Sequence, residues 1–194
     1  MSNSDDLIDA LVPVVEAFQK LRIRHYVCGS IASSFHGAPR TTMDVDVVAE
    51  LSEDQISEFM SCFGDQFYLS EAAVRDAVRR RSCFNPIHLP SSFKVDVFIS
   101  RERPFDVESM RRATLESLGE SPSVQVPIAT AEDTIISKLE CFRLTDESSE
   151  RQWDDVSRLL KLLGNAADFT YLRRAAESVD VEDLLERLIT EIGK

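Results

Sequence analysis

The feature that most constrains this chain is a pair of aspartates set in an apolar stretch. A short hydrophobic run ends at Gly29-Ser30, and after a gap the alternating segment Asp44-Val45-Asp46-Val47 follows. Alternation with a period of two predicts a β-strand, on which Asp44 and Asp46 project from one face and the valines from the other. Two carboxylates held this close repel each other unless a cation lies between them. The pattern therefore predicts a divalent-metal site, although a strand end with solvated carboxylates is the simpler alternative.

The residues before this strand indicate a phosphate-binding turn. Ile23 to Cys28 form an apolar run suited to a buried strand, and residues 30–35 resemble the first turns of a helix. Free N–H groups at a helix start attract anions. Gly29 lets the backbone approach a ligand closely, and the Ser30 hydroxyl adds a donor. Magnesium is commonly shared between protein carboxylates and the phosphates of a substrate. The turn and the two aspartates together therefore predict a single site that binds a phosphate and its metal ion.

This stretch resembles the signature of the polymerase-beta nucleotidyltransferase superfamily, in which a hydrophobic residue and Gly-Gly or Gly-Ser precede two alternating acidic residues. The longer form, from Gly29-Ser30 to Arg40-Thr41-Thr42-Met43-Asp44-Val45-Asp46, is similar to the AbiEii-type nucleotidyltransferases. These are found as toxins of bacterial toxin–antitoxin pairs and as related uncharacterised proteins. Members carry a third carboxylate on a later strand, and Asp96 in the apolar segment 93–99 matches it. Taken alone, Asp96 would equally suit an edge strand that faces water.

The resemblance extends, with less specific residues, as far as Leu163. The family follows its sheet with a helix that carries a functional Lys before a Leu, here Lys138-Leu139, and then with an Arg-Asp-x-x-Asp helix. Residues 151–156 match the second helix except that Gln152 replaces its first Asp, whereas Asp155 keeps its place. Helical spacing puts Lys138 at the border of an apolar stripe, where it either lies along the core or reaches a triphosphate. Asp154 points away from its stripe and is expected in solvent.

Composition limits the classes of protein that this chain can belong to. At 194 residues it fits one domain or a compact core with a helical appendage, and no stretch approaches the ~20 apolar residues of a membrane helix. Its acidic beginning is unlike a secretory signal. Its four cysteines lack metal-ligand or Cys-x-x-Cys spacing, so we expect buried free thiols in the cytoplasm. The net charge of −12 argues against a protein that coats nucleic acid non-specifically.

Basic residues nonetheless crowd the middle of the chain. They are Arg75, Arg79, Arg80, Arg81, Lys94, Arg101, Arg103, Arg111 and Arg112. The interpretation that we favour places them on solvated helix faces and turns. The alternative is a basic rim beside the active site that holds a tRNA or another anionic acceptor.

Periodicity predicts an α+β fold, in which a nucleotidyltransferase-like mixed β-sheet flanked by helices precedes a C-terminal helical bundle. We expect a core over residues 1–128 and a helical region over 129–194 that completes the nucleotide cleft. The strands are expected at 23–28, 44–48, 67–69, 82–88, 93–99, 114–118 and 124–128. The helices are expected at 7–21 (with Pro13 as a kink or a start), from 30, at 52–63 and 71–80, and from 130 onward. A late apolar stripe is formed by Leu184, Leu185, Leu188 and Ile189. The favoured interpretation is that this stripe packs on its own domain, and the alternative is that it forms a dimer contact. The oligomeric state stays open.

The resemblance implies transfer of a nucleoside monophosphate from an NTP to an acceptor hydroxyl, with release of pyrophosphate. Asp44 and Asp46 would hold two Mg²⁺ (or Mn²⁺) ions about 4 Å apart, with Asp96 as a further ligand or base. The residues expected to bind the nucleotide are Gly29, Ser30, Lys138 and Asp155. Arg40 and Thr42 are expected to have a structural role in the loop, with contact to the substrate as the alternative. No histidine is given a catalytic role.

The residues leave the acceptor open. An RNA end such as that of a tRNA is favoured, and a protein hydroxyl or a small hydroxylated molecule is the alternative. A second hypothesis is a catalytically silent protein of this fold that binds a nucleotide or a partner in a toxin–antitoxin-type system. The retention of Asp44, Asp46 and Asp96 argues against it, because an inactive site would have little reason to keep three repelling carboxylates.

Overall fold

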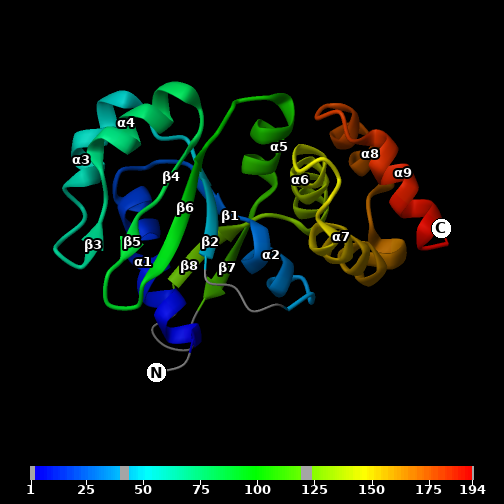
Figure 1. Cartoon of the computed structure of the whole chain (residues 1–194), viewed down its shortest axis with the longest axis horizontal. Coiled ribbons are helices and arrows are strands. Elements are labelled where there is room, and N and C mark those ends of the chain that lie inside the picture. Colours follow the sequence, from blue (N-terminus) through cyan, green and yellow to red (C-terminus); the bar gives the residue numbers. More distant parts are fainter. Residues whose placement is uncertain (1–2, 40–43, 119–123, 194) are drawn as a thin grey trace.

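A mixed sheet forms the centre of the computed structural model, which describes residues 3–39, 44–118 and 124–193 (Figure 1). Within these residues its strands run in the order β3-β5-β6-β2-β1-β8-β7, and β4 also pairs with β6. β2 runs parallel to β6 and β1 parallel to β8, while the other pairs are antiparallel. The strands are β1 (His25–Val27), β2 (Asp44–Ala49), β3 (Phe67–Tyr68), β4 (Cys83–Phe84), β5 (Ile87–His88), β6 (Phe93–Ile99), β7 (Thr114–Leu118) and β8 (Val124–Ile128). The predicted mixed sheet is confirmed.

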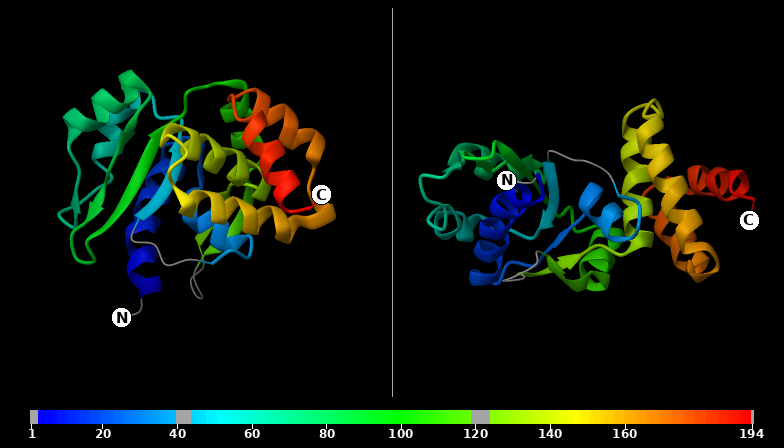
Figure 2. Two further views of the ribbon diagram at one scale, coloured as in Figure 1. Left: turned by 45° about the vertical axis from the view of Figure 1, so that its right-hand side comes forward. Right: turned by 90° about the horizontal axis from the view of Figure 1, so that it is seen from below.

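Helices flank this sheet and then continue alone to the end of the chain. Those before residue 129 are α1 (Asn3–Lys20), α2 (Gly29–Phe35), the 3-10 turn η1 (Glu53–Gln55), α3 (Ile56–Met60), α4 (Glu71–Arg80) and α5 (Pro104–Arg112). Those after it are α6 (Ala131–Leu144), α7 (Glu150–Leu163), the 3-10 turn η2 (Gly164–Ala166), α8 (Phe169–Glu177) and α9 (Glu182–Glu191). In both further views, α6 to α9 gather at one end of the molecule and α3 with α4 at the other (Figure 2).

Two hydrophobic clusters stabilise the sheet with its flanking helices and the bundle of α6 to α9, respectively. The first joins α1 to the sheet, with Phe18 of α1 and Val45 and Val47 of β2 among its fully buried side chains. The second lies among α6 to α9 and includes the predicted late stripe. All four residues of that stripe are buried, so the stripe packs within its own bundle, as favoured. α1 continues through Pro13, which therefore does not mark its start.

The structure differs from the predicted elements in three places. The single strand expected at 82–88 is split into β4 and β5, because Pro86 has no N–H for the ladder. The Pro86 carbonyl still accepts from the Val95 N–H at 2.9 Å, so the pairing with β6 keeps its register across the break. The helix expected at 52–63 is divided between η1 and α3 and ends at Met60. Helix α5 was not predicted, although Pro104 stands at a favoured first position.

Candidate active site

The sheet brings the three predicted carboxylates onto one face. In the parallel pairing of β2 with β6, Asp46 lies directly beside Asp96, and Asp44 lies beside Lys94. Residues two apart on a strand share a face, so all four side chains project from the same side. The alternate valines of both strands are fully buried on the other side, against α1. The alternation that buries the valines therefore also fixes where the charged groups gather.

The turn after β1 is in direct contact with this face. Gly29 begins α2 with φ +61°, a backbone conformation that favours glycine. A Cβ built on Gly29 would lie 2.7 Å from Cγ and 2.9 Å from Cβ of Asp46 and would collide with its Oδ2. The Cys28 N–H also donates to the Asp46 carbonyl at 2.8 Å. The turn and Asp46 thus occupy adjoining space, and only a residue without a side chain fits between them.

The electrostatic setting of Asp46 is unfavourable for a carboxylate. Burial, followed by the charges of Asp44 and Asp96, raises the pKa of Asp46 to about 6, while Lys138 and Lys94 act in the opposite direction. The ionised form of Asp46 is thus disfavoured first by burial and then by the two neighbouring carboxylates. A bound cation would stabilise this ionised form.

Asp96 is held by two donors that sequence analysis did not identify as site residues. Lys94 Nζ lies 2.8 Å from Asp96 Oδ2, and the Asn85 amide donates to Oδ1. Asn85 follows β4, which pairs with β6, so the hairpin carries it to the aspartate. Lys94 could have been found, because it lies two residues before Asp96 on the same strand face. Asn85 gave no signal, since its position depends on the hairpin register.

Lys138 and Asp155 form an ion pair beside this face. Lys138 Nζ donates to Asp155 Oδ2 at 2.8 Å and to Gln152 Oε1 at 3.3 Å. Both charged residues are buried, with exposures of 5% and 8%. Lys138 comes from α6 and its partners from α7, so the pair joins the two helices. Gln152, which departs from the family pattern, therefore still contacts the lysine.

The donors present suit a hard divalent cation. Asp44, Asp46 and Asp96 offer only carboxylate oxygens, which is the ligand type that magnesium prefers. As the side chains stand, no three His, Cys, Asp or Glu among the described residues are grouped closely enough to enclose a metal ion. At Asp96, both oxygens are already engaged by Lys94 and Asn85.

The comparison with protein families decides the classification. The family model "Nucleotidyl transferase AbiEii toxin, Type IV TA system" matches residues 16–192. The chain belongs to this AbiEii family. It is therefore a nucleotidyltransferase of a toxin–antitoxin family, as the resemblance implied. No curated protein sequence matches it.

Solved structures support the same fold for this AbiEii-family chain. An antigenic nucleotidyltransferase-like protein from Paracoccidioides brasiliensis is 18% identical with a TM-score of 0.53, over 96% of this chain and 93% of that one. ANT(2″)-Ia in complex with adenylyl-2″-tobramycin is 11% identical with a TM-score of 0.51, over 88% of this chain and 97% of that one. At these identities the likeness concerns the fold alone.

The basic residues in the middle of the AbiEii-family chain are all paired with acids. Each lies within 4.0 Å of a carboxylate, as the ion pairs of Arg81 with Glu102 and of Arg103 with Glu140 illustrate. This arrangement agrees in part with the favoured interpretation of solvated helix faces and turns, although Arg103 and Arg112 are half-buried against acids of α6. Lys94 differs from the rest, because its partner is a site carboxylate.

The remaining predicted residues fall into three groups. Arg40 and Thr42 lie outside the described residues. His36 caps the C-terminus of α2, and its Nε2 also contacts the Ala129 carbonyl at 2.7 Å. The four cysteines are free, but Cys141 is exposed and the others are half-buried, so the expectation of buried thiols was wrong. Burial raises the pKa of Cys28 and, to about 11, that of Cys83, which keeps both thiols protonated at neutral pH.

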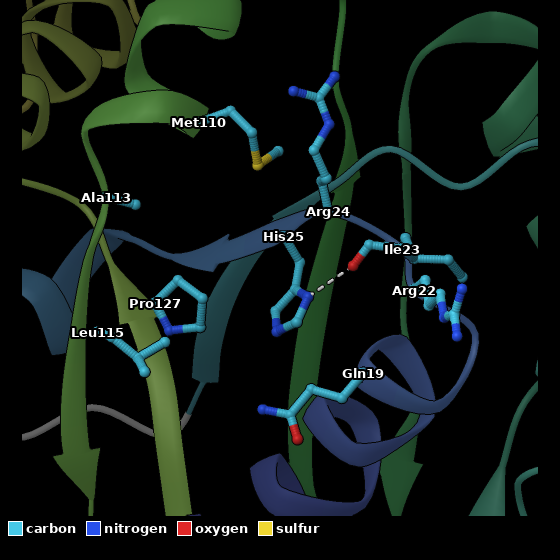
Figure 3. A pocket seen from close by; sticks show the side chains of 9 residues that line it. All are labelled: Gln19, Arg22, Ile23, Arg24, His25, Met110, Ala113, Leu115 and Pro127. Atoms are coloured by element: carbon cyan, nitrogen blue, oxygen red, sulfur yellow. Dashed lines mark hydrogen bonds between the residues drawn. The ribbon is translucent and has the colours of Figure 1, made fainter.

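A cavity of about 380 Å³ lies elsewhere in the AbiEii-family chain, between the end of α1, the start of β1 and the β7–β8 hairpin (Figure 3). His25 lines it and donates from Nδ1 to the Ile23 carbonyl at 2.9 Å. His25 pairs with Ala49 of β2, so its ring shares the face of the buried valines and not that of the aspartates.

No described helix combines the length and apolar composition needed to cross a bilayer.

Proposed function

We propose that the chain transfers a nucleoside monophosphate from an NTP to an acceptor hydroxyl in a reaction that depends on Mg²⁺ or Mn²⁺. The observation that carries this proposal is the contact between the Gly29 turn and Asp46, on the same sheet face as Asp44 and Asp96. This contact would place a phosphate and a cation side by side. The raised pKa of Asp46 adds support, because a bound cation would stabilise a carboxylate that is disfavoured by burial and by the charges of Asp44 and Asp96.

Each site residue has a role in this scheme. Asp44, Asp46 and Asp96 would hold the divalent cation, which would neutralise phosphate charge and activate the acceptor hydroxyl. Gly29 and Ser30 would receive the phosphates at the start of α2. Lys138 already lies near enough to lower the pKa of Asp46, so its positive charge acts on the reacting region. Asp155 and Gln152 would hold that lysine in place.

The proposed division of the chain follows from these roles. Residues 1–128 would supply the carboxylates and the phosphate turn, and residues 129–194 would supply Lys138 and Asp155. The nucleotide would then bind where the two parts meet. Free cysteines agree with action in the cytoplasm.

For the acceptor we propose an RNA end such as that of a tRNA, in keeping with the toxin description of the family. The pairing of the central arginines removes the electrostatic support that a basic rim would have given. A small hydroxylated molecule is a second candidate, because ANT(2″)-Ia, a protein with this fold, is described in complex with adenylyl-2″-tobramycin. A protein hydroxyl is the third.

The test presents the purified chain with each α-labelled NTP and Mg²⁺, together with total RNA, a cell lysate or an aminoglycoside. RNA, protein and small molecules are then resolved separately. Label on one fraction would identify the acceptor class, and Asp44→Ala should abolish it. Asp154→Ala is the matched control, since this carboxylate is exposed on α7. Full transfer by Asp44→Ala would refute the scheme, and Mg²⁺-dependent NTP binding without any transfer would favour the silent hypothesis.

A further inference from the structure

Lys94 forms an ion pair with one of the proposed metal ligands and lies beside a second. Its ammonium is 2.8 Å from Asp96 Oδ2, and β6 sets it directly beside Asp44 in the pairing with β2. The charge of Lys94 also offsets part of the rise in the pKa of Asp46. One cation thus shares a sheet face with three carboxylates and compensates part of their charge.

Asn85 completes the hold on Asp96. Its side-chain amide donates to Oδ1, while Lys94 contacts Oδ2, so each carboxylate oxygen has its own donor. The Asp96 side chain is 14% exposed, whereas that of Lys94 is 42% exposed. The lysine can therefore move into solvent more easily than the aspartate can.

A divalent cation bound to Asp96 Oδ2 and the Lys94 ammonium would compete electrostatically for the same carboxylate oxygen. Magnesium binds carboxylate oxygens at about 2.1 Å, so a cation there would lie within a few ångströms of Lys94 Nζ and would repel it. Metal binding at Asp96 is therefore expected to weaken the contact between Lys94 and Asp96. A neutral donor such as Asn85 would be repelled far less.

We propose that Lys94 is a positioning residue of the site, which holds Asp96 in the metal-free enzyme and competes with the divalent cation for it. This inference rests on the proposed function for the identity of the metal ligands. Asn85 orients the other oxygen throughout. The competition lowers the affinity for the metal alone, and it keeps Asp96 in position until a metal arrives.

The test measures binding of Mn²⁺ alone to the full chain, by the electron paramagnetic resonance signal of the free ion. Lys94→Met should bind Mn²⁺ about tenfold or more tightly than wild type, because a positive charge next to the metal is removed. Lys94→Arg, which keeps the charge, and Lys161→Met, which removes an exposed lysine of α7, should stay within about twofold. In an Asp96→Asn background, the gain from Lys94→Met should be at least about threefold smaller.

Equal or weaker Mn²⁺ binding by Lys94→Met would overturn the proposal, and so would the absence of measurable binding by both wild type and variant. Circular dichroism checks that the variants are folded, and Lys94→Gln replaces Lys94→Met if the latter does not fold. These outcomes are separate from those of the transfer assay. If wild type transfers nucleotide but Lys94→Met binds Mn²⁺ no more tightly than wild type, only the role of Lys94 is refuted. If Lys94→Met binds Mn²⁺ more tightly but wild type transfers no nucleotide, only the proposed function is refuted.

Discussion

Replacing Gly29 by alanine tests whether the phosphate turn and the Asp46 carboxylate share one space. At φ +61° an alanine carries a conformational cost of about 1–2 kcal/mol. Its Cβ would also lie 2.7 Å from Asp46 Cγ, and overpacking of this kind typically costs a further ~1–3 kcal/mol. We therefore expect Gly29→Ala to lower the free energy of unfolding by about 2–5 kcal/mol. The assay is urea denaturation followed by circular dichroism.

Gly37→Ala is the matched control for this experiment. Gly37 also has a positive φ, +89°, but among the described residues its Cβ would meet Leu162 Cδ1 alone, at 3.5 Å. This variant should therefore cost the conformational part alone, about 1–2 kcal/mol. Gly64→Ala, with nothing within 4 Å and no positive φ, should leave stability unchanged or raise it by up to about 1 kcal/mol.

The contact with Asp46 can be isolated by a double-mutant cycle. In an Asp46→Ala background, the cost of Gly29→Ala should fall toward that of Gly37→Ala, because Cγ and Oδ2 are gone. The reasoning is refuted if Gly29→Ala costs no more than Gly37→Ala, or if Asp46→Ala leaves its cost unchanged. Either result would mean that the turn does not depend on the space beside this carboxylate.

Three further predictions concern buried charges. Lys138→Met leaves the Asp155 carboxylate buried without its cation, so we expect a loss of about 3–5 kcal/mol in unfolding free energy. Because the folded-state pKa of Asp46, about 6, lies above its ordinary 3.8, wild type loses stability as pH rises through this interval. Asp46→Asn should thus be more stable than wild type by about 1–3 kcal/mol at pH 8 and equal to it near pH 3, measured by thermal unfolding without metal. Tyr171→Phe removes the hydroxyl that donates to Asp133, which is 1% exposed, and should cost about 1–3 kcal/mol in urea denaturation.

The lysine and tyrosine predictions each have a control of the same chemistry, and the Asp46→Asn prediction is checked by its pH dependence. Lys161→Met removes an exposed lysine, and Tyr68→Phe changes a tyrosine that is 60% exposed, so both should be nearly neutral. A cost for Lys138→Met or Tyr171→Phe no greater than that of its control would contradict the buried interaction. An Asp46→Asn difference that does not shrink toward low pH would contradict the raised pKa.

Most of the strands and helices, and the identity of the central residues, could be derived from the sequence, whereas α5 and the break between β4 and β5 could not. Strict alternation around Asp44 and Asp46 defines a strand with one buried face, because a slip of one residue would expose the valines. Thr130 and Ser149 cap the helices that carry Lys138 and Asp155, as their positions indicated. These are local properties, which depend on residues within one or two turns.

Only the tertiary structure decided what surrounds the aspartates. The pairing of β2 with β6 joins segments about fifty residues apart in the chain and sets Asp46 beside Asp96. The hairpin brings Asn85 to Asp96, and the packing of α6 on α7 buries Lys138 against Gln152. The sequence specifies which face of each strand is buried, but the choice of partner strand and partner helix depends on how all the apolar faces fit into two cores. The compensation of charge in the site is consequently a property of the fold, whereas the charges themselves are a property of the sequence.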